Sequence, residues 1–162
     1  MTATGNRGKP MKRIIQAFAV VLAMLGMSAS THAAEKAKEH RIVVQVDQND
    51  PAVMNLVLNN VQNMLQYYNG KGETAKIEVA AYGPGLNMLR DDKSPVKDRL
   101  IHMAKDGSFP SNLQFSACHN TMMGMEKKEG HPIPILSVAK VVPSGVVRLT
   151  ELQEEGWTYL RP

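Results

Sequence analysis

The stretch RIVVQVDQNDP, residues 41–51, decides the fold. Residues 42–44 are three consecutive β-branched residues, a pattern typical of a strand that is buried on both faces. Asp50 followed by Pro51 predicts the start of a helix, because aspartate caps free amide groups and proline fits the first turn. Apolar residues then recur at spacings of three and four as far as Tyr68, which predicts an amphipathic helix after the strand.

The alternation of strand and helix continues along the rest of the chain. We expect further strands over 75–82, 113–117 and 157–160, and one more within 133–142. We expect further helices over 86–89, 95–106, 119–128 and 146–155. Such alternation predicts a three-layer α/β fold with a mainly parallel sheet of about five strands. Ligand sites in such folds lie beyond the carboxyl ends of the strands, near the point where the strand order reverses.

The first 34 residues resemble a targeting signal. Lys12 and Arg13 precede an apolar run over 17–27, which is followed by small residues. This order indicates a signal peptide that is cleaved after Ala33 or Ala34. The apolar run has about a dozen residues, whereas a membrane-spanning helix needs roughly 20. We therefore expect a periplasmic or secreted protein without a stable membrane anchor, a charged flexible leader over 35–40 and one domain over 41–162.

Removal of this segment changes the charge of the protein. Four of the 19 basic residues and none of the 15 acidic residues precede residue 35, so the remainder carries 15 of each sign. A balanced chain without a basic stripe excludes nucleic acid as an expected partner. A net charge near zero favours self-association.

Cys118 is the one cysteine of the chain and lies in FSACHNT, residues 115–121, at a predicted strand-to-helix turn. An exported protein with one thiol cannot form an internal disulfide, so this thiol is inert, paired with another molecule or free for chemistry. A helix N-terminus favours the thiolate. His119 is either a proton partner for that thiolate or a solvated residue of the first helical turn.

Several segments resemble the DsrE/DsrF-like family, which includes the TusD-type sulfur-relay proteins. The similar segments are LNNVQNML (58–65), EVAAYGPGL (78–86), FSACHNT (115–121), VPSGV (142–146) and LQEEGW (152–157). The resemblance covers 41–162 and implies a flavodoxin-like sheet, a homo-oligomer and a cysteine that carries a persulfide. Cys118 matches that cysteine, so the resemblance implies a sulfur-binding or sulfur-transfer module that exchanges sulfur with a donor or acceptor.

The predicted site combines the thiol with residues at the strand ends. The catalytic candidates are Cys118 and His119. The candidates for binding are Asn60, Gly83, Gly85, Asn120, Thr121, Ser144 and Gly145. For Asn60 the alternative is a structural hydrogen bond, and for the Gly-Pro-Gly turn it is a turn with unusual dihedral angles.

Two other functions compete with sulfur transfer. One is a non-catalytic binding or oligomerisation domain in which Cys118 is buried and inert, as free cysteines often are. The other is a periplasmic copper-binding protein, because Met122, Met123 and Met125 follow Cys118 closely and soft sulfur ligands suit Cu(I). We expect no bound metal and no cofactor in the leading interpretation, since the spacings typical of zinc and phosphate-loop sites are absent from the sequence.

Overall fold

The computed structural model of the 162-residue chain describes residues 1–2, 38–105 and 112–162. The predicted signal segment from residue 3 onward, the first three leader residues and the end of the predicted helix at 106 lie outside the described residues. In the part of the chain that the structure describes, no helix combines the length and the apolar character needed to cross a membrane.

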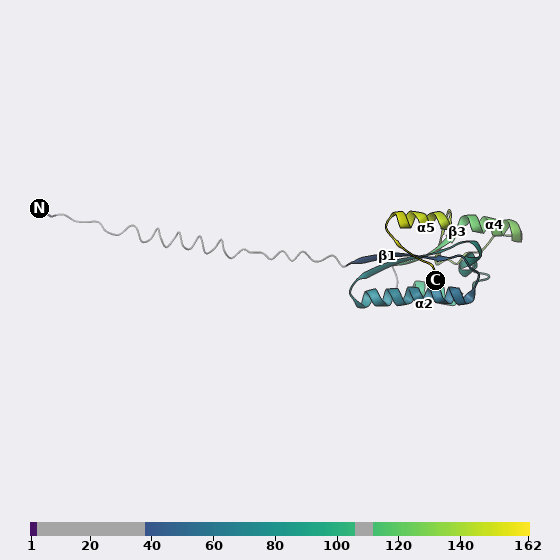
Figure 1. Cartoon of the computed structure of the whole chain (residues 1–162), viewed down its shortest axis with the longest axis horizontal. Helices are drawn as coiled ribbons and strands as arrows, with labels where there is room; N and C mark the ends of the chain where they lie inside the picture. The colour runs from purple at the N-terminus through teal and green to yellow at the C-terminus, as the bar shows by residue number, and fades with distance from the viewer. Residues whose placement is uncertain (3–37, 106–111) are drawn as a thin grey trace. The chain divides into compact units, whose positions relative to one another are not determined.

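One five-stranded sheet forms the centre of the domain (Figure 1). Its strands are β1 (Glu39–Val46), β2 (Thr74–Ala81), β3 (Leu113–Cys118), β4 (Ala139–Val142) and β5 (Thr158–Leu160), in the order β4-β3-β2-β1-β5. All four strand pairings are parallel. The strand order reverses between β1 and β5, because the chain runs outward from β1 to β4 and then returns to the other side of β1.

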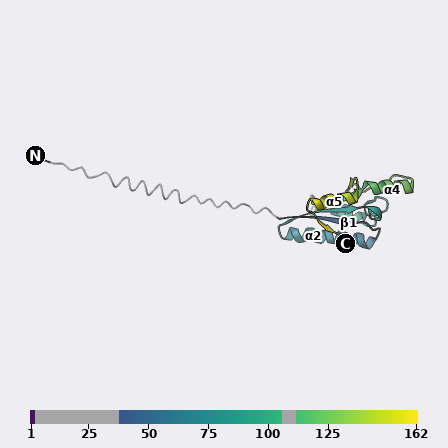
Figure 2. The same cartoon turned by 45° about the horizontal axis from the view of Figure 1, so that its top comes forward.

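Helices lie on both sides of this sheet, as Figures 1 and 2 show. The helices are α2 (Pro51–Gly70), the 3-10 helix η1 (Gly83–Leu89), α3 (Lys97–Lys105), α4 (His119–Glu129) and α5 (Gly145–Glu154). Side chains of α2, α3 and η1 share the main core with one face of the sheet. Helices α4 and α5 lie on the opposite side in both views. The predicted three-layer, flavodoxin-like α/β fold is thus confirmed.

The two faces of the sheet are packed unequally. Alternate residues of each strand point to the α2 face, where they join a large apolar cluster that includes Val44, Val79 and Phe115. The second cluster lies under α5 and consists of Val43, Ala80, Leu149 and Leu152. Polar residues, among them Glu78 and Ser116, occupy the same face beyond α5.

The start of β1 differs from the prediction. β1 begins at Glu39, so Glu39 and His40, which we assigned to the leader, belong to the strand. His40 bonds to Glu73 at 2.8 Å and stacks on Tyr68, which fixes the start of the strand. The fourth strand, Ala139–Val142, lies within the predicted segment 133–142. Earlier in that segment Ile135 forms an antiparallel bridge with Arg90, and residues 137–138 form a turn.

Candidate functional site

Cys118 is the last residue of β3 and the N-cap of α4. Its backbone is extended, with φ −72° and ψ 113°, and its side chain takes the place of a capping oxygen. The backbone N–H of Thr121 donates to Sγ over 3.4 Å. β3 residues alternate between faces, so Cys118 points to the same face as Ser116, toward α5. The predicted position of the thiol, at a turn from strand to helix, is confirmed.

One hydrogen bond, from the N–H of Thr121, reaches the sulfur atom, and three further polar groups affect its ionisation. Burial raises the pKa of the Cys118 thiol, but the Thr121 side chain and the backbone N–H groups of Gly145, Thr121 and Asn120 all lower it. The lowering contributions prevail, and the pKa lies below the ordinary value of 9.0. The sulfur is therefore buried among oriented donors, an environment that stabilises the charged thiolate.

The hydroxyl group of Thr121 links the thiol to the turn after β2. The backbone N–H of Gly83 donates to Thr121 Oγ1 over 2.9 Å. Because this oxygen already accepts a hydrogen bond, its own hydrogen is free to point to Cys118. Gly83 thus acts on the sulfur through Thr121, in a role that the sequence did not reveal.

Two glycines allow the strand ends to approach closely. A Cβ atom on Gly145 would lie 2.7 Å from the Cβ of Tyr82, and a Cβ on Gly85 would collide with the carbonyl oxygen of Val46. Gly83 has a φ of +52°, which favours glycine. The Gly-Pro-Gly segment is therefore a turn with an unusual dihedral angle at Gly83, as the alternative interpretation predicted. The absence of a side chain at Gly145 lets its N–H approach Cys118.

Tyr82 and Pro143 complete the surroundings of the thiol but were not among the predicted residues. The Tyr82 ring packs on Gly145, and burial and the charge of Asp47 raise the pKa of Tyr82. The carbonyl oxygen of Pro143 accepts from the N–H of Asn120 over 3.2 Å, which joins the start of α4 to the turn after β4. The position of Tyr82, an aromatic residue directly after β2, was the sequence signal that could have identified it as part of the site.

The far end of α4 is fixed by a buried arginine. Arg90 is fully buried and donates to Glu129 at the end of α4 over 2.6 and 2.9 Å. It also binds Asp92 over 2.9 and 2.7 Å. The hydrogen bonds from Arg90, followed by the one from Lys93, lower the pKa of Glu129 to about 2. Both ends of α4 are thus attached to the rest of the domain.

Of the other predicted site residues, Asn120 alone acts on the sulfur atom, and only through its backbone. His119 is exposed, and among the described residues its ring makes no hydrogen bond. Asn60 lies half-buried near the middle of α2, on the other side of the sheet. Ser144 occupies the N-cap position of α5, but its side chain makes no capping hydrogen bond there. Asn120 contributes its backbone N–H, while its side chain is exposed.

The methionines of α4 do not face one side. Met122 and Met125 pack against the main core, whereas Met123 is exposed. Arg90 approaches the sulfur of Met125 at 3.8 Å. Within the described ranges, no group of three or more His, Cys, Asp or Glu residues could hold a metal ion.

The chemistry available at the site follows from the exposure of the sulfur. Cys118 is 4% exposed, so the adjoining turns enclose almost all of the residue. The point where the strand order reverses lies two strands away, where Arg161 binds Asp47 over 2.9 Å. Cys118 therefore lies on the carboxyl edge of the sheet, as predicted, but not beside that reversal. The arrangement suits a thiolate nucleophile at the carboxyl edge of the sheet.

The structure is similar to that of a protein of unknown function, MTH1491, from Methanobacterium thermoautotrophicum. The match has a TM-score of 0.61 and 31% sequence identity, and it covers 76% of this chain and 99% of that one. No protein-family model and no curated protein matches the sequence.

Proposed function

We propose that this chain, which belongs to the same family as MTH1491, is a sulfur carrier in which Cys118 holds a persulfide. The observation that carries the proposal is the set of donors around Sγ, which holds the pKa of the thiol below 9.0 although the residue is buried. The thiolate is the nucleophilic form of cysteine, so this environment favours attack on sulfur. The resemblance to the DsrE/DsrF-like family points to the same cysteine.

The proposed reaction needs no oxidant. The Cys118 thiolate attacks the outer sulfur of a donor persulfide, R–S–SH. A new S–S bond forms to Cys118, the S–S bond of the donor breaks, and the donor leaves as a thiolate. An acceptor thiolate then attacks the outer sulfur on Cys118 in the same way, which restores the Cys118 thiolate. The protein is thus a carrier that is sulfurtransferase-like at most.

The donor groups have a specific role in this cycle. The Thr121 hydroxyl and the N–H groups of Asn120, Thr121 and Gly145 stabilise the thiolate before attack. When acceptor attack expels Cys118 as a leaving group, negative charge returns to Sγ. The same donors stabilise that charge, so they assist both half-reactions. His119 has no role in this proposal, because its ring makes no hydrogen bond among the described residues.

We place this reaction outside the cytosol, in the periplasm or in secreted form. The support is the sequence alone, namely the basic, apolar and small-residue order over 12–34. The partners in this proposal are a sulfur donor, a sulfur acceptor and further copies of the chain. Fractionation of cells that express the full chain tests the location, and cytosolic protein of unprocessed mass contradicts it.

Persulfide labelling tests the proposed reaction. Wild-type protein and Cys118→Ser are incubated with glutathione persulfide, freed of the donor, and then mixed with a small thiol acceptor. We expect wild type to gain one sulfur atom and to release it to the acceptor, while Cys118→Ser gains none. Unaltered wild-type mass under conditions in which the donor persulfide is intact overturns the proposal.

One observation favours a second candidate function. The 4% exposure of Cys118 is also typical of a thiol that merely fills space at a strand end. In that case the chain is a non-catalytic binding or assembly domain. A wild-type thiol that resists alkylation in the folded protein at all pH values, together with a self-associated solution mass, supports this second candidate.

A further inference from the structure

The outer face of α2 carries no charge. None of the 20 residues of Pro51–Gly70 is acidic or basic. The exposed side of a helix normally carries charged residues, as α4 does with Lys127 and Lys128. The outward positions of α2 hold mostly asparagine and glutamine, together with Leu56, which is 46% exposed, and Tyr67, which is 60% exposed. An exposed aromatic residue on a face without charges is typical of the centre of a protein–protein interface.

A second stripe of residues runs along this face, apart from the stripe that packs on the sheet. Its members lie alternately three and four residues apart and are Val53, Leu56, Asn60, Asn63 and Tyr67. This is the spacing at which two helices pack along a shared seam. The buried stripe consists of other residues, namely Met54, Val57, Leu58, Val61 and Leu65. One copy of the chain therefore uses one stripe for its own core and presents the other on the outer side of its helix layer (Figures 1 and 2).

The polar members of the outer stripe suit a second copy of the same helix. The side chains of Asn60 and Asn63 make no hydrogen bond with the residues that the structure describes. A side-chain amide both donates and accepts, so it is complementary to another amide. Asparagine within an otherwise apolar seam also fixes the register of two packed helices. The outer stripe is thus complementary to itself.

The two ends of α2 favour an antiparallel pair. Asp50 caps the start of the helix, and Lys71 follows its end, with Nζ 4.7 Å from the centre of the Tyr67 ring. In an antiparallel pair centred between Asn60 and Asn63, Lys71 of one copy approaches the Asp50 end of the other. The positive end of each helix dipole then also lies beside the negative end of the other. A parallel pair would bring like charges together at both ends, which is unfavourable.

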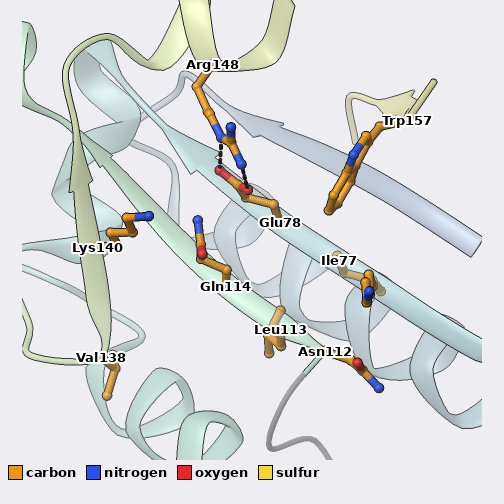
Figure 3. A pocket seen from close by; sticks show the side chains of 10 residues that line it. Ile77, Glu78, Asn112, Leu113, Gln114, Val138, Lys140, Arg148 and Trp157 are labelled. Carbon is orange, nitrogen blue, oxygen red and sulfur yellow. Dashed lines mark hydrogen bonds and ion pairs between the residues drawn. The ribbon is translucent and has the colours of Figure 1, made fainter. Parts of the chain in front are cut away.

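The uncovered part of the opposite sheet face has a different character. A hollow beside α5, with a volume of about 340 Å³, is lined by the paired side chains of Glu78 and Arg148, which are joined by hydrogen bonds of 2.9 and 2.8 Å (Figure 3). The exposed Lys76 and Lys140 line it as well. Lysine is depleted at the centres of interfaces. We therefore place contact between copies on α2 and not on this charged face.

We propose that two copies of this chain pack through the outer faces of their α2 helices, antiparallel and related by a two-fold axis. Leu56 of each copy packs against Tyr67 of the other, and Asn60 of each bonds to Asn63 of the other. A helix of 20 residues is about 30 Å long, roughly the width of an interface of about 800 Å² per partner. The inference rests on the self-association named in the proposed function, but it needs no chemistry at Cys118.

Sedimentation equilibrium of the full-length chain tests this surface. We expect wild type to have the mass of a dimer. Leu56→Glu should raise the dissociation constant of the dimer at least about tenfold, because each copy then buries a charge at the seam. Glutamate favours a helix and Leu56 is largely exposed in one copy, so the far-UV circular dichroism spectrum should not change.

Met123→Glu is the matched control, because Met123 is 54% exposed on α4. This variant should remain a dimer. Wild type that is monomeric at its highest soluble concentration overturns the proposal, and so does a folded Leu56→Glu variant that associates as wild type does. A monomeric wild type that gains sulfur contradicts this inference alone, whereas a dimer that gains no sulfur contradicts the proposed reaction alone.

Disulfide cross-linking tests the antiparallel register. In a Cys118→Ser background, Leu56→Cys protein and Tyr67→Cys protein are oxidised separately and as a mixture. We expect the mixture to form a linked dimer well above the level in either variant alone, because position 56 of one copy lies against position 67 of the other. Cross-linking of each variant with itself, as a parallel pair requires, or no cross-linking in the mixture overturns the proposed arrangement.

Discussion

Thr121 decides how reactive Cys118 can be. Its backbone N–H and its side chain both bind Sγ, and the side chain is held in place by the N–H of Gly83. A buried thiol without such donors has a raised pKa and little thiolate at neutral pH. We therefore expect the hydroxyl group of Thr121 to increase the thiolate fraction of Cys118.

Replacement of Thr121 by valine tests this dependence. Thr121→Val keeps the shape but removes the hydroxyl group, so we expect the pKa of Cys118 to rise. Near neutral pH the thiolate fraction falls, and alkylation by iodoacetamide slows roughly three- to tenfold. The loss of the acceptor for Gly83 also lowers the free energy of unfolding by about 1–2 kcal/mol. Alkylation rates measured against pH provide the readout.

Thr150→Val is the control for this substitution. Thr150 is exposed on α5, where its hydroxyl binds only the carbonyl oxygen of Val146. The alkylation profile of this variant should match wild type. An unshifted profile for Thr121→Val would show that the hydroxyl group does not set the ionisation of Cys118.

The start of α5 must lie close to β2 for its N–H to reach the sulfur. Gly145→Ala places a methyl group 2.7 Å from the Cβ of Tyr82, and backbone and ring cannot both stay in place. We expect the free energy of unfolding to fall by about 1–3 kcal/mol, with a higher pKa for Cys118 because the Gly145 N–H moves away. Urea denaturation and thiol titration measure the two effects.

Gly124→Ala is the matched control on α4. A Cβ at Gly124 meets nothing within 4 Å, and alanine favours the helix. This variant should be more stable than wild type by about 0.5–1 kcal/mol. If Gly145→Ala also gains stability, the close approach of Gly145 to Tyr82 does not require glycine at this position.

The attachment of α4 through Arg90 predicts a pH dependence of stability. The pKa of Glu129 falls from 4.5 to about 2 in the folded protein, chiefly through its hydrogen bonds with Arg90. A lowered folded-state pKa stabilises the fold fully above about pH 4.5, and this contribution is lost as the pH falls toward about 2. Urea denaturation of wild type between pH 2 and pH 6 should show this decline.

Two glutamine variants isolate the contribution of Glu129. Glu129→Gln should lower the free energy of unfolding at pH 6 and flatten its decline in acid. Glu154→Gln, at an exposed position of α5, should leave the wild-type dependence unchanged. Identical pH curves for wild type and Glu129→Gln would contradict the role of this ion pair.

The order of the elements was predictable because each has a strong local signal. Consecutive β-branched residues specify β1, and the Asp50–Pro51 pair specifies the start of α2, where Asp50 caps the N–H of Ala52 over 2.7 Å. The bounds of β4 within 133–142 were less predictable, because Ile135 pairs with Arg90, which is distant in the sequence. The inclusion of Glu39 and His40 in β1 depends on Glu73 and Tyr68, about 30 residues later, and local patterns do not contain that contact.

At the scale of the whole molecule, the parallel topology brings segments that are distant in the sequence to the same edge of the sheet. The sulfur environment combines the turn after β2, the start of α4 and the start of α5. The sequence predicted Cys118, Thr121 and Gly145 as neighbours because parallel strands end at one edge. It did not predict the link from Gly83 to Thr121, the packing of Tyr82 on Gly145 or the hollow beside α5, because these depend on long-range side-chain packing.

The mass of the intact protein after exposure to a sulfane-sulfur donor tests the central claim most directly. Wild-type protein is treated with glutathione persulfide near neutral pH, and peptide mapping then locates any added atom. The account predicts the gain of one sulfur atom on Cys118, removable by a thiol acceptor. Protein that keeps its original mass while its Cys118 thiol stays unmodified and unreactive would contradict it.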